Sequence, residues 1–155
     1  MNDLTVDFSH LDRETVLHDW RWLIGSSKLP ILLTAAGDAF VQDAEDGTVH
    51  FLGVSAGQLH PVAGSAEELR SLLANEDFVV SHFAVQMIGA LMQAGKRLEA
   101  DQIYSFEVPP VLGGQYALEN VEVTDIAVHF SVAGQIHDKV RNLPPRTPIN
   151  RFTVS

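Results

Sequence analysis

The sequence predicts a single mixed α+β domain, in which an antiparallel meander of four or five short strands packs with four helices. Three observations support this fold class. The chain has 155 residues, 46% of them hydrophobic and 19% charged, so one domain can bury a core without a staple. Strand-like segments follow one another across turns too short for parallel crossovers. Helical periodicity on both sides of these segments supplies the helices.

The first element expected is a helix over residues 13–24, where apolar residues recur at helical spacing before Gly25. On a helix, two positions two residues apart differ by about 200°. Trp20 and Trp22 would therefore face opposite ways. If Trp20 faces the core, Trp22 is left for a second partner or for solvent.

The meander follows this helix. Gly, Asp and Ser residues separate its strands, and Asp46-Gly47 is the strongest hairpin dipeptide of the chain. Alternating or continuous apolar residues mark the strands themselves. We expect them over residues 30–34, 39–42, 48–52 and 58–62.

Three further helices are predicted. Ser65-Ala-Glu-Glu68 is a capping box that opens the first of them. Asn75 caps a longer and largely buried helix over residues 76–94. After a strand at 103–106 and a rigid Pro-Pro-Val-Leu-Gly-Gly connector, a last helix is expected over 125–142, capped by Thr124, although its valines would also suit a strand.

Charge is distributed unevenly along the chain. Residues 1–138 hold all 20 acidic side chains and six of the ten basic ones, a net charge of −14, whereas residues 139–155 are basic and rich in proline. We therefore divide the chain into a domain over 1–142 and a basic tail over 143–155. Such an acidic domain repels phosphate backbones, which disfavours nucleic acid as a partner. The acidity suits a basic protein partner, or it serves solubility alone.

Composition excludes several classes of protein. The chain has no cysteine, which removes disulfides, thiolate zinc sites and a cysteine nucleophile. The N-terminus lacks a signal-peptide pattern, and apolar runs fall short of the roughly 20 residues that a membrane span requires. We expect a cytoplasmic protein that does not bind membranes.

No motif predicts catalytic, cofactor-binding or metal-binding residues. Gly53-Val-Ser-Ala-Gly57 spells a nucleophile elbow, but a strand and not a helix follows it, so Ser55 is interpreted as a loop residue. The seven histidines lack zinc-ligand spacing, and only His50 and His60 could face each other across a hairpin. The carboxylates of Asp38, Asp43, Glu45 and Asp46 do not follow a calcium-loop pattern and are expected to be exposed alike on a solvated hairpin turn.

Several segments resemble a known bacterial family. They are Trp20–Gly25, Thr34–Val41, Asp46–Leu52, Ile103–Gly114, Glu119–Val121 and Val128–His137, of which the Pro-Pro-Val-Leu-Gly-Gly segment is the most specific. Together they resemble the Tdi-type C-terminal domain of immunity proteins for type VI secretion DNase effectors, over about residues 16–142. The resemblance implies a small α/β fold without catalytic residues, which binds and neutralises a cognate effector inside the producing cell.

These observations together favour a non-enzymatic immunity-type protein whose partner is an effector toxin with a basic nuclease domain. The alternatives are a regulatory adaptor that uses the same acidic surface, or a small-ligand or metal-binding enzyme with a pocket at His50, His60 or His82. Exposed aromatic and charged side chains are the usual contact anchors. The candidate contacts are Trp22, Asp43, Glu45, Asp46, Glu67 and Glu68.

Overall fold

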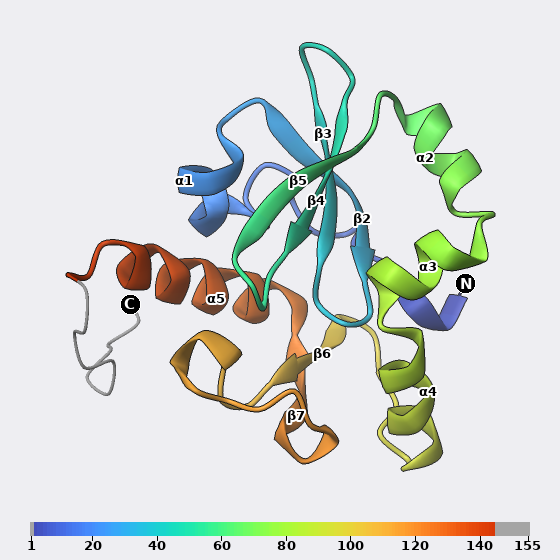
Figure 1. Cartoon of the computed structure of the whole chain (residues 1–155), viewed down its shortest axis with the longest axis vertical. Coiled ribbons are helices and arrows are strands. Elements are labelled where there is room, and N and C mark those ends of the chain that lie inside the picture. Colours follow the sequence, from blue (N-terminus) through green and yellow to red (C-terminus); the bar gives the residue numbers. More distant parts are fainter. Residues whose placement is uncertain (1, 145–155) are drawn as a thin grey trace.

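A five-stranded antiparallel sheet forms the centre of the computed structural model, which describes residues 2–144 (Figure 1). Its strands are paired in chain order, so the sheet is a meander and the predicted α+β class is confirmed. The added edge strand, β1, pairs with the end of β2. The strands are β1 (Thr5–Val6), β2 (Lys28–Thr34), β3 (Ala39–Asp43), β4 (Val49–Gly53) and β5 (Gln58–Ala63).

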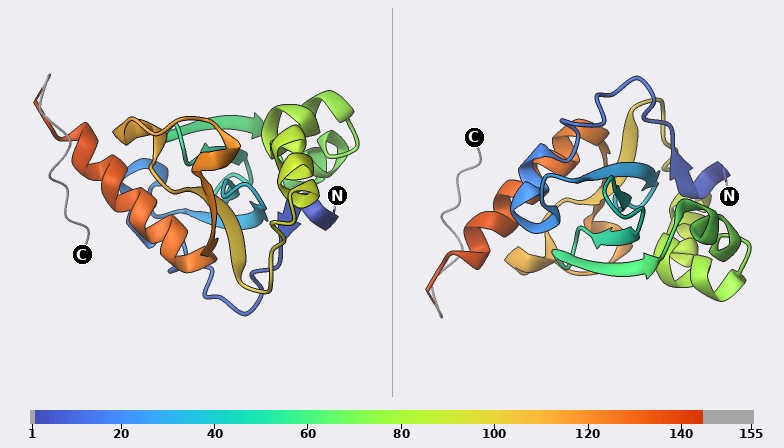
Figure 2. Two further views of the ribbon diagram at one scale, coloured as in Figure 1. Left: turned by 90° about the horizontal axis from the view of Figure 1, so that it is seen from below. Right: turned by 90° about the horizontal axis from the view of Figure 1, so that it is seen from above.

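Two groups of helices flank this sheet. Figure 2 shows α5 on one side and α2, α3 and α4 on the other. The α-helices are α1 (Arg21–Ile24), α2 (Ala66–Leu72), α3 (Glu76–Phe83), α4 (Val85–Gln93) and α5 (Ile126–Arg141). Short 3₁₀ turns are η1 (Asn2–Leu4), η2 (His18–Trp20), η3 (Pro110–Leu112) and η4 (Leu118–Asn120).

A second, two-stranded antiparallel sheet connects the helix groups. It pairs β6 (Gln102–Phe106) with β7 (Val121–Asp125), and β7 leads directly into α5. The valines near residue 121 therefore form a strand, while the helix begins only after Asp125. Asp125, and not the predicted Thr124, caps this helix, because its Oδ1 accepts the Val128 N–H at 3.1 Å.

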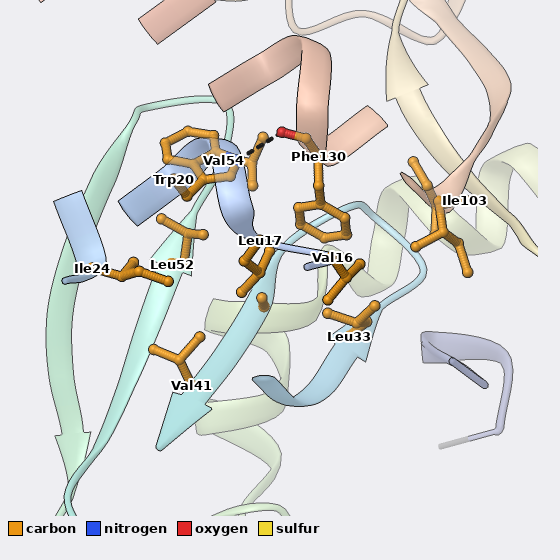
Figure 3. Close-up of a cluster of buried hydrophobic side chains, with 12 residues drawn as sticks. Val16, Leu17, Trp20, Ile24, Leu33, Val41, Leu52, Val54, Ile103 and Phe130 are labelled. Carbon is orange, nitrogen blue, oxygen red and sulfur yellow. Dashed lines mark hydrogen bonds between the residues drawn. The ribbon is translucent and has the colours of Figure 1, made fainter. Parts of the chain in front are cut away.

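Both faces of the meander are buried, because alternate residues of its central strands point to opposite sides. Ala39 and Val41 face α5 and the first helical segment, whereas Phe40 packs with Phe51 and Phe83 on the other face. Figure 3 shows the first core, in which Trp20 is fully buried and its indole N–H donates to the Phe130 carbonyl at 2.9 Å. This bond connects the first helical segment to α5.

Two predicted helices are shorter than the periodicity indicated. Within residues 13–24, only η2 and α1 form, and the preceding residues are turns. The helix expected over 76–94 divides at Ala84, which has a left-handed φ of 50°. The break lets Phe83 join the core under β3 while Ile88 packs toward β6 and β7, so tertiary packing divides an otherwise continuous apolar segment.

The predicted basic tail, residues 143–155, lies outside the described residues beyond Pro144. Among residues 2–144, no helix has the length and apolar character needed to cross a membrane.

Candidate functional site

Three of the predicted contact residues lie on the turn between β3 and β4. Asp43 Oδ1 accepts the Glu45 N–H at 2.7 Å, and Asp46 Oδ1 accepts the Thr48 N–H at 2.9 Å. These hydrogen bonds to their charged forms hold the pKa values of Asp43 and Asp46 below the usual range. Asp43 and Asp46 therefore build the turn, while Glu45 projects from it as an exposed side chain.

Glu67 and Glu68 lie in the first turn of α2, and both are exposed. The predicted capping box is confirmed, because Ser65 Oγ accepts the Glu68 N–H and Glu68 Oε2 accepts the Gly64 N–H, each at 3.0 Å. Ala63, just before α2, pairs with Val49, just after the β3–β4 turn. The turn and the start of α2 therefore occupy the same end of the sheet (Figure 1). We call Asp43, Glu45, Asp46, Glu67 and Glu68 the acidic end.

Trp22 lies apart from the acidic end and is half-buried. Its ring stacks on Trp20, with 5.8 Å between the centroids, and its indole N–H donates to the Gly134 carbonyl at 3.2 Å. The Arg141 guanidinium lies 4.5 Å from the ring centroid. The two tryptophans do not face opposite ways, because a 3₁₀ turn precedes α1 and replaces the regular helix assumed for residues 13–24.

A cavity of about 440 Å³ lies at the other end of the sheet, within the size range of ligand sites. The β2–β3 turn, the β4–β5 turn, the β6–β7 ribbon and α5 surround it, and Ala84 and Met87 complete its wall. The wall is mainly apolar, and the first four elements contribute its polar groups. The polar and charged lining residues are Asp38, Ser55, Ser105, Glu107, Tyr116, Glu122, Thr124, His129 and His137.

Two histidines of α5 hold the two sheet turns against the helix. The His129 Nε2–H donates to the Gly37 carbonyl at 2.8 Å, and the ring of His137 bonds to the Val54 carbonyl. Gly37 and Gly57 have positive φ, and at each the histidine ring occupies the place of a Cβ. Burial lowers the pKa of His129 to about 4 and also lowers that of His137, so both rings are neutral at pH 7.

Asp38 lines the same cavity as these two histidines. Its Oδ1 accepts the Val54 N–H at 2.8 Å, and Oδ2 has no hydrogen-bond partner among residues 2–144. Burial raises the pKa of Asp38 to about 7, against which the single hydrogen bond acts only weakly. The expectation that Asp38, Asp43, Glu45 and Asp46 are exposed alike is wrong. Asp38 and Asp43, at the two ends of β3, are half-buried, whereas Glu45 and Asp46 are exposed.

The rim of the cavity is formed by the connector between β6 and β7. Asn120 holds this connector together: its Oδ1 accepts the Val108 N–H at 2.9 Å, and its Nδ2 donates to the carbonyls of Val108 and Gln115. Gly114 lies directly against the Val108 carbonyl, where no Cβ would fit. The two sequence segments around the Pro-Pro-Val-Leu-Gly-Gly motif and Asn120 therefore form one structural unit.

Of the residues considered for the alternative catalytic or metal sites, the structure of residues 2–144 brings together His60 and His82, whose ring centroids lie 6.1 Å apart. Ser55 lies in a turn between two strands, and among the described residues no hydrogen bond joins it to His129 or His137. His50 pairs with Pro61, while His60 pairs with Phe51, so these histidines point to opposite faces of the sheet. Residues 2–144 contain no group of three or more His, Asp or Glu that could hold a metal ion.

The segment that builds most of this cavity matches a known protein family. Residues 63–137 match the family described as "T6SS immunity protein Tdi1, C-terminal". This confirms the resemblance predicted from the sequence motifs. The Tdi1-matched segment runs from the end of β5 into α5, so it contains α2 to α4, the β6–β7 ribbon with Asn120, and both cavity histidines.

A solved structure shares the fold. The crystal structure of Atu4351 from Agrobacterium tumefaciens superposes on this chain with a TM-score of 0.60 and 19% sequence identity. The superposition covers 79% of this chain. The present chain spans 64% of the length of that protein. A search of curated proteins found no match.

The sequence motifs indicated the family but not the cavity. Asp38 and His129 belong to segments that resembled the family, yet their roles depend on contacts outside those segments. His129 bonds to Gly37, 92 positions away, and Asp38 accepts the N–H of Val54, 16 positions away. The sequence signal that could have pointed to the cavity was the glycine in each of two meander turns, because a glycine lets another element approach the backbone closely.

Proposed function

We propose that this protein is an immunity protein that binds a cognate type VI effector and neutralises it by direct protein–protein contact. The match of residues 63–137 to the Tdi1 family carries the proposal. An immunity protein of this kind needs a surface complementary to its effector and no reaction centre of its own. The proposal accordingly assigns no catalytic residue to the chain.

The charge of the chain supports a nuclease as the toxic domain. A nuclease must be basic where it contacts the phosphate backbone. The net charge of −14 over residues 1–138 complements such a surface and would accelerate association at low salt. Salt would screen this attraction, so the association rate should fall as ionic strength rises.

The acidic end is the first proposed contact surface, with Trp22 at its own separate position as a further candidate. Glu45 and Glu67 are the residues of choice for testing it. Both are exposed, whereas Asp43, Asp46 and Glu68 also accept hydrogen bonds that hold the turn and the helix start. Reversing the charge of Glu45 and Glu67 therefore changes the surface with little effect on the fold.

The test begins with capture of the effector from the source organism by the tagged protein, followed by a DNA-cleavage assay of the captured partner with and without added protein. The affinity is then measured for the double variant Glu45→Lys and Glu67→Lys. Glu14→Lys and Glu99→Lys form the matched control, because these exposed residues lie elsewhere and change the net charge equally.

A captured nuclease that the protein inhibits would support the proposal, and a loss of affinity confined to the Glu45 and Glu67 variant would support the acidic end as the contact. Equal affinities in both double variants would exclude the acidic end. Capture of a housekeeping protein without toxic activity would instead favour a regulatory adaptor, and capture of nothing by the folded protein would contradict the immunity proposal.

A further inference from the structure

The cavity at the far end of the sheet has an uncompensated negative charge. Asp38, Glu107 and Glu122 are its charged lining residues, and no lysine or arginine lines it. Its two histidines are neutral at pH 7, so they do not offset these carboxylates. A larger cavity of about 630 Å³ near the N-terminus differs in this respect, because Arg97 lies among its acidic residues.

The mouth of this cavity is an exposed apolar surface. Tyr116 is 70% exposed, and Val128 and Val132 of α5 are 53% and 36% exposed. Val128 and Val132 are four residues apart, so they lie on the same face of the helix. Exposed apolar side chains around a concave, charged interior are typical of a binding surface and are costly to leave in water.

The ribbon β6–β7 explains how acid and apolar groups come to share the cavity. Tyr104 and Val123 pair on the face that packs against α4. Ser105 pairs with Glu122 on the other face, which lines the cavity, and Ser105 Oγ lies 2.9 Å from Thr124 Oγ1. Strand alternation therefore directs Glu122 toward the same space as Asp38.

We propose that this cavity receives an arginine side chain of the effector, with Glu107 and Glu122 at its mouth and Asp38 in its interior. The inference rests on the proposed function, because it takes the effector as the source of the arginine. It places a second contact surface opposite the acidic end. The matched Tdi1 segment supplies both glutamates and most of the apolar wall.

Arginine fits this combination of walls better than a lysine or a free metal ion does. Its planar guanidinium is weakly hydrated, stacks on aromatic rings and donates in a fork that suits carboxylates. Phe106 and Tyr116 form an edge-to-face pair at the cavity, with 5.3 Å between their centroids. Asp38 Oδ2 has no partner in the described residues, and burial opposes its ionisation; a cation would supply the missing countercharge.

The first experiment tests the cavity without the effector. The isotope-labelled full chain is titrated with Nα-acetyl-arginine amide, and the citrulline analogue serves as the uncharged probe of the same shape. We expect saturable chemical-shift changes at Val54, Phe106 and His129 with the arginine probe and not with citrulline. The double variant Glu107→Gln and Glu122→Gln should bind the arginine probe about tenfold more weakly, since hydrogen bonds to charged partners are lost.

The second experiment uses the captured effector. The same Glu107 and Glu122 variant should lose about tenfold in affinity for it, whereas Glu14→Gln and Glu99→Gln, which remove the same charge elsewhere, should not. Circular dichroism and thermal unfolding of each variant show that the fold is retained.

The outcomes separate this inference from the proposed function. Absence of probe shifts at the cavity overturns the arginine site. Probe binding together with unchanged effector affinity shows a site for a small cation and overturns docking of the effector there. If the effector binds and is inhibited normally by the cavity variant, the immunity proposal stands and this inference fails. If no effector is captured, the proposed function fails, and so does the proposal that an effector arginine enters the cavity.

Discussion

Replacing Asp38 by asparagine is expected to stabilise the protein at pH 8 and to leave its stability nearly unchanged near pH 4. Burial raises the pKa of this carboxyl to about 7 in the folded state, from 3.8 without burial. The folded protein therefore retains a proton that the unfolded chain has lost between these pH values. Its stability falls as pH rises through this window, because the folded state must bury a charge. Asparagine keeps the acceptor for the Val54 N–H and removes that cost.

The size of the effect follows from the two pKa values. At 1.36 kcal/mol per pH unit, a difference of about three units corresponds to at most about 4 kcal/mol at pH 8. For a domain of this length, such a gain raises Tm by about 10 °C. His129 acts in the opposite sense: its pKa of about 4 gives stability above pH 6.5 that is lost as pH falls. Between pH 4 and 6.5 the Asp38 and His129 trends offset one another in the native protein, and the Asp38 trend is absent from the variant.

Urea unfolding at a series of pH values from 4 to 8 measures this difference directly. Asp46→Asn is the matched control, because it also removes one negative charge from an acidic chain. The pKa of Asp46 is lowered by its hydrogen bonds to Thr48, so its replacement should destabilise the protein at pH 8. Stabilisation of both variants would indicate relief of general charge repulsion. An Asp38→Asn variant no more stable than the native protein at pH 8 would refute the buried-carboxylate reasoning.

Two further substitutions test the packing of the turns and the connector. Gly57→Ala should destabilise the protein by about 2–4 kcal/mol, because the added methyl group meets the His137 ring at a position with positive φ. Gly47→Ala is the control: its φ is also positive but the space around it is open, so it should cost only about 1 kcal/mol. Thermal unfolding compares the two variants, and equal losses of stability would contradict the role of the ring. Asn120→Ala should cost about 1 kcal/mol and accelerate hydrogen exchange at the Val108 amide, and unchanged exchange there would show that Asn120 does not hold the connector.

Local sequence rules predicted the parts of the fold that depend on neighbouring residues. The Ser65 and Asn75 caps were recognisable because each accepts an N–H three positions ahead. The meander was recognisable because its turns are short and contain Gly and Asp. The break at Ala84 was not, since no Gly or Pro marks it. Only the need to serve two different cores selects the left-handed conformation there.

The candidate site was less predictable than the fold. Asp38 and Asp43 are five residues apart and looked alike, yet they lie at the two ends of β3. Both are half-buried, but Asp43 accepts hydrogen bonds within the β3–β4 turn, which lower its pKa, whereas desolvation of Asp38 between the other two turns raises its own. Sequence proximity cannot distinguish these environments, because a strand carries residues that are close in sequence to opposite ends of the sheet.

By itself, the sequence determined the α+β class, the order of the meander, the Ser65 and Asn75 caps, the excess of acid over base and the resemblance to the Tdi1 family. These properties depend on composition and on contacts within a few residues. Only the tertiary structure decided that His129 meets Gly37, that Trp20 meets Phe130, and that Asp38 shares a cavity with Glu122. The two hydrogen-bonded pairs are 92 and 110 positions apart, and the two cavity carboxylates are also far apart in the sequence. They exist only because α5 packs across the completed sheet, and no local pattern encodes which residues that packing brings together.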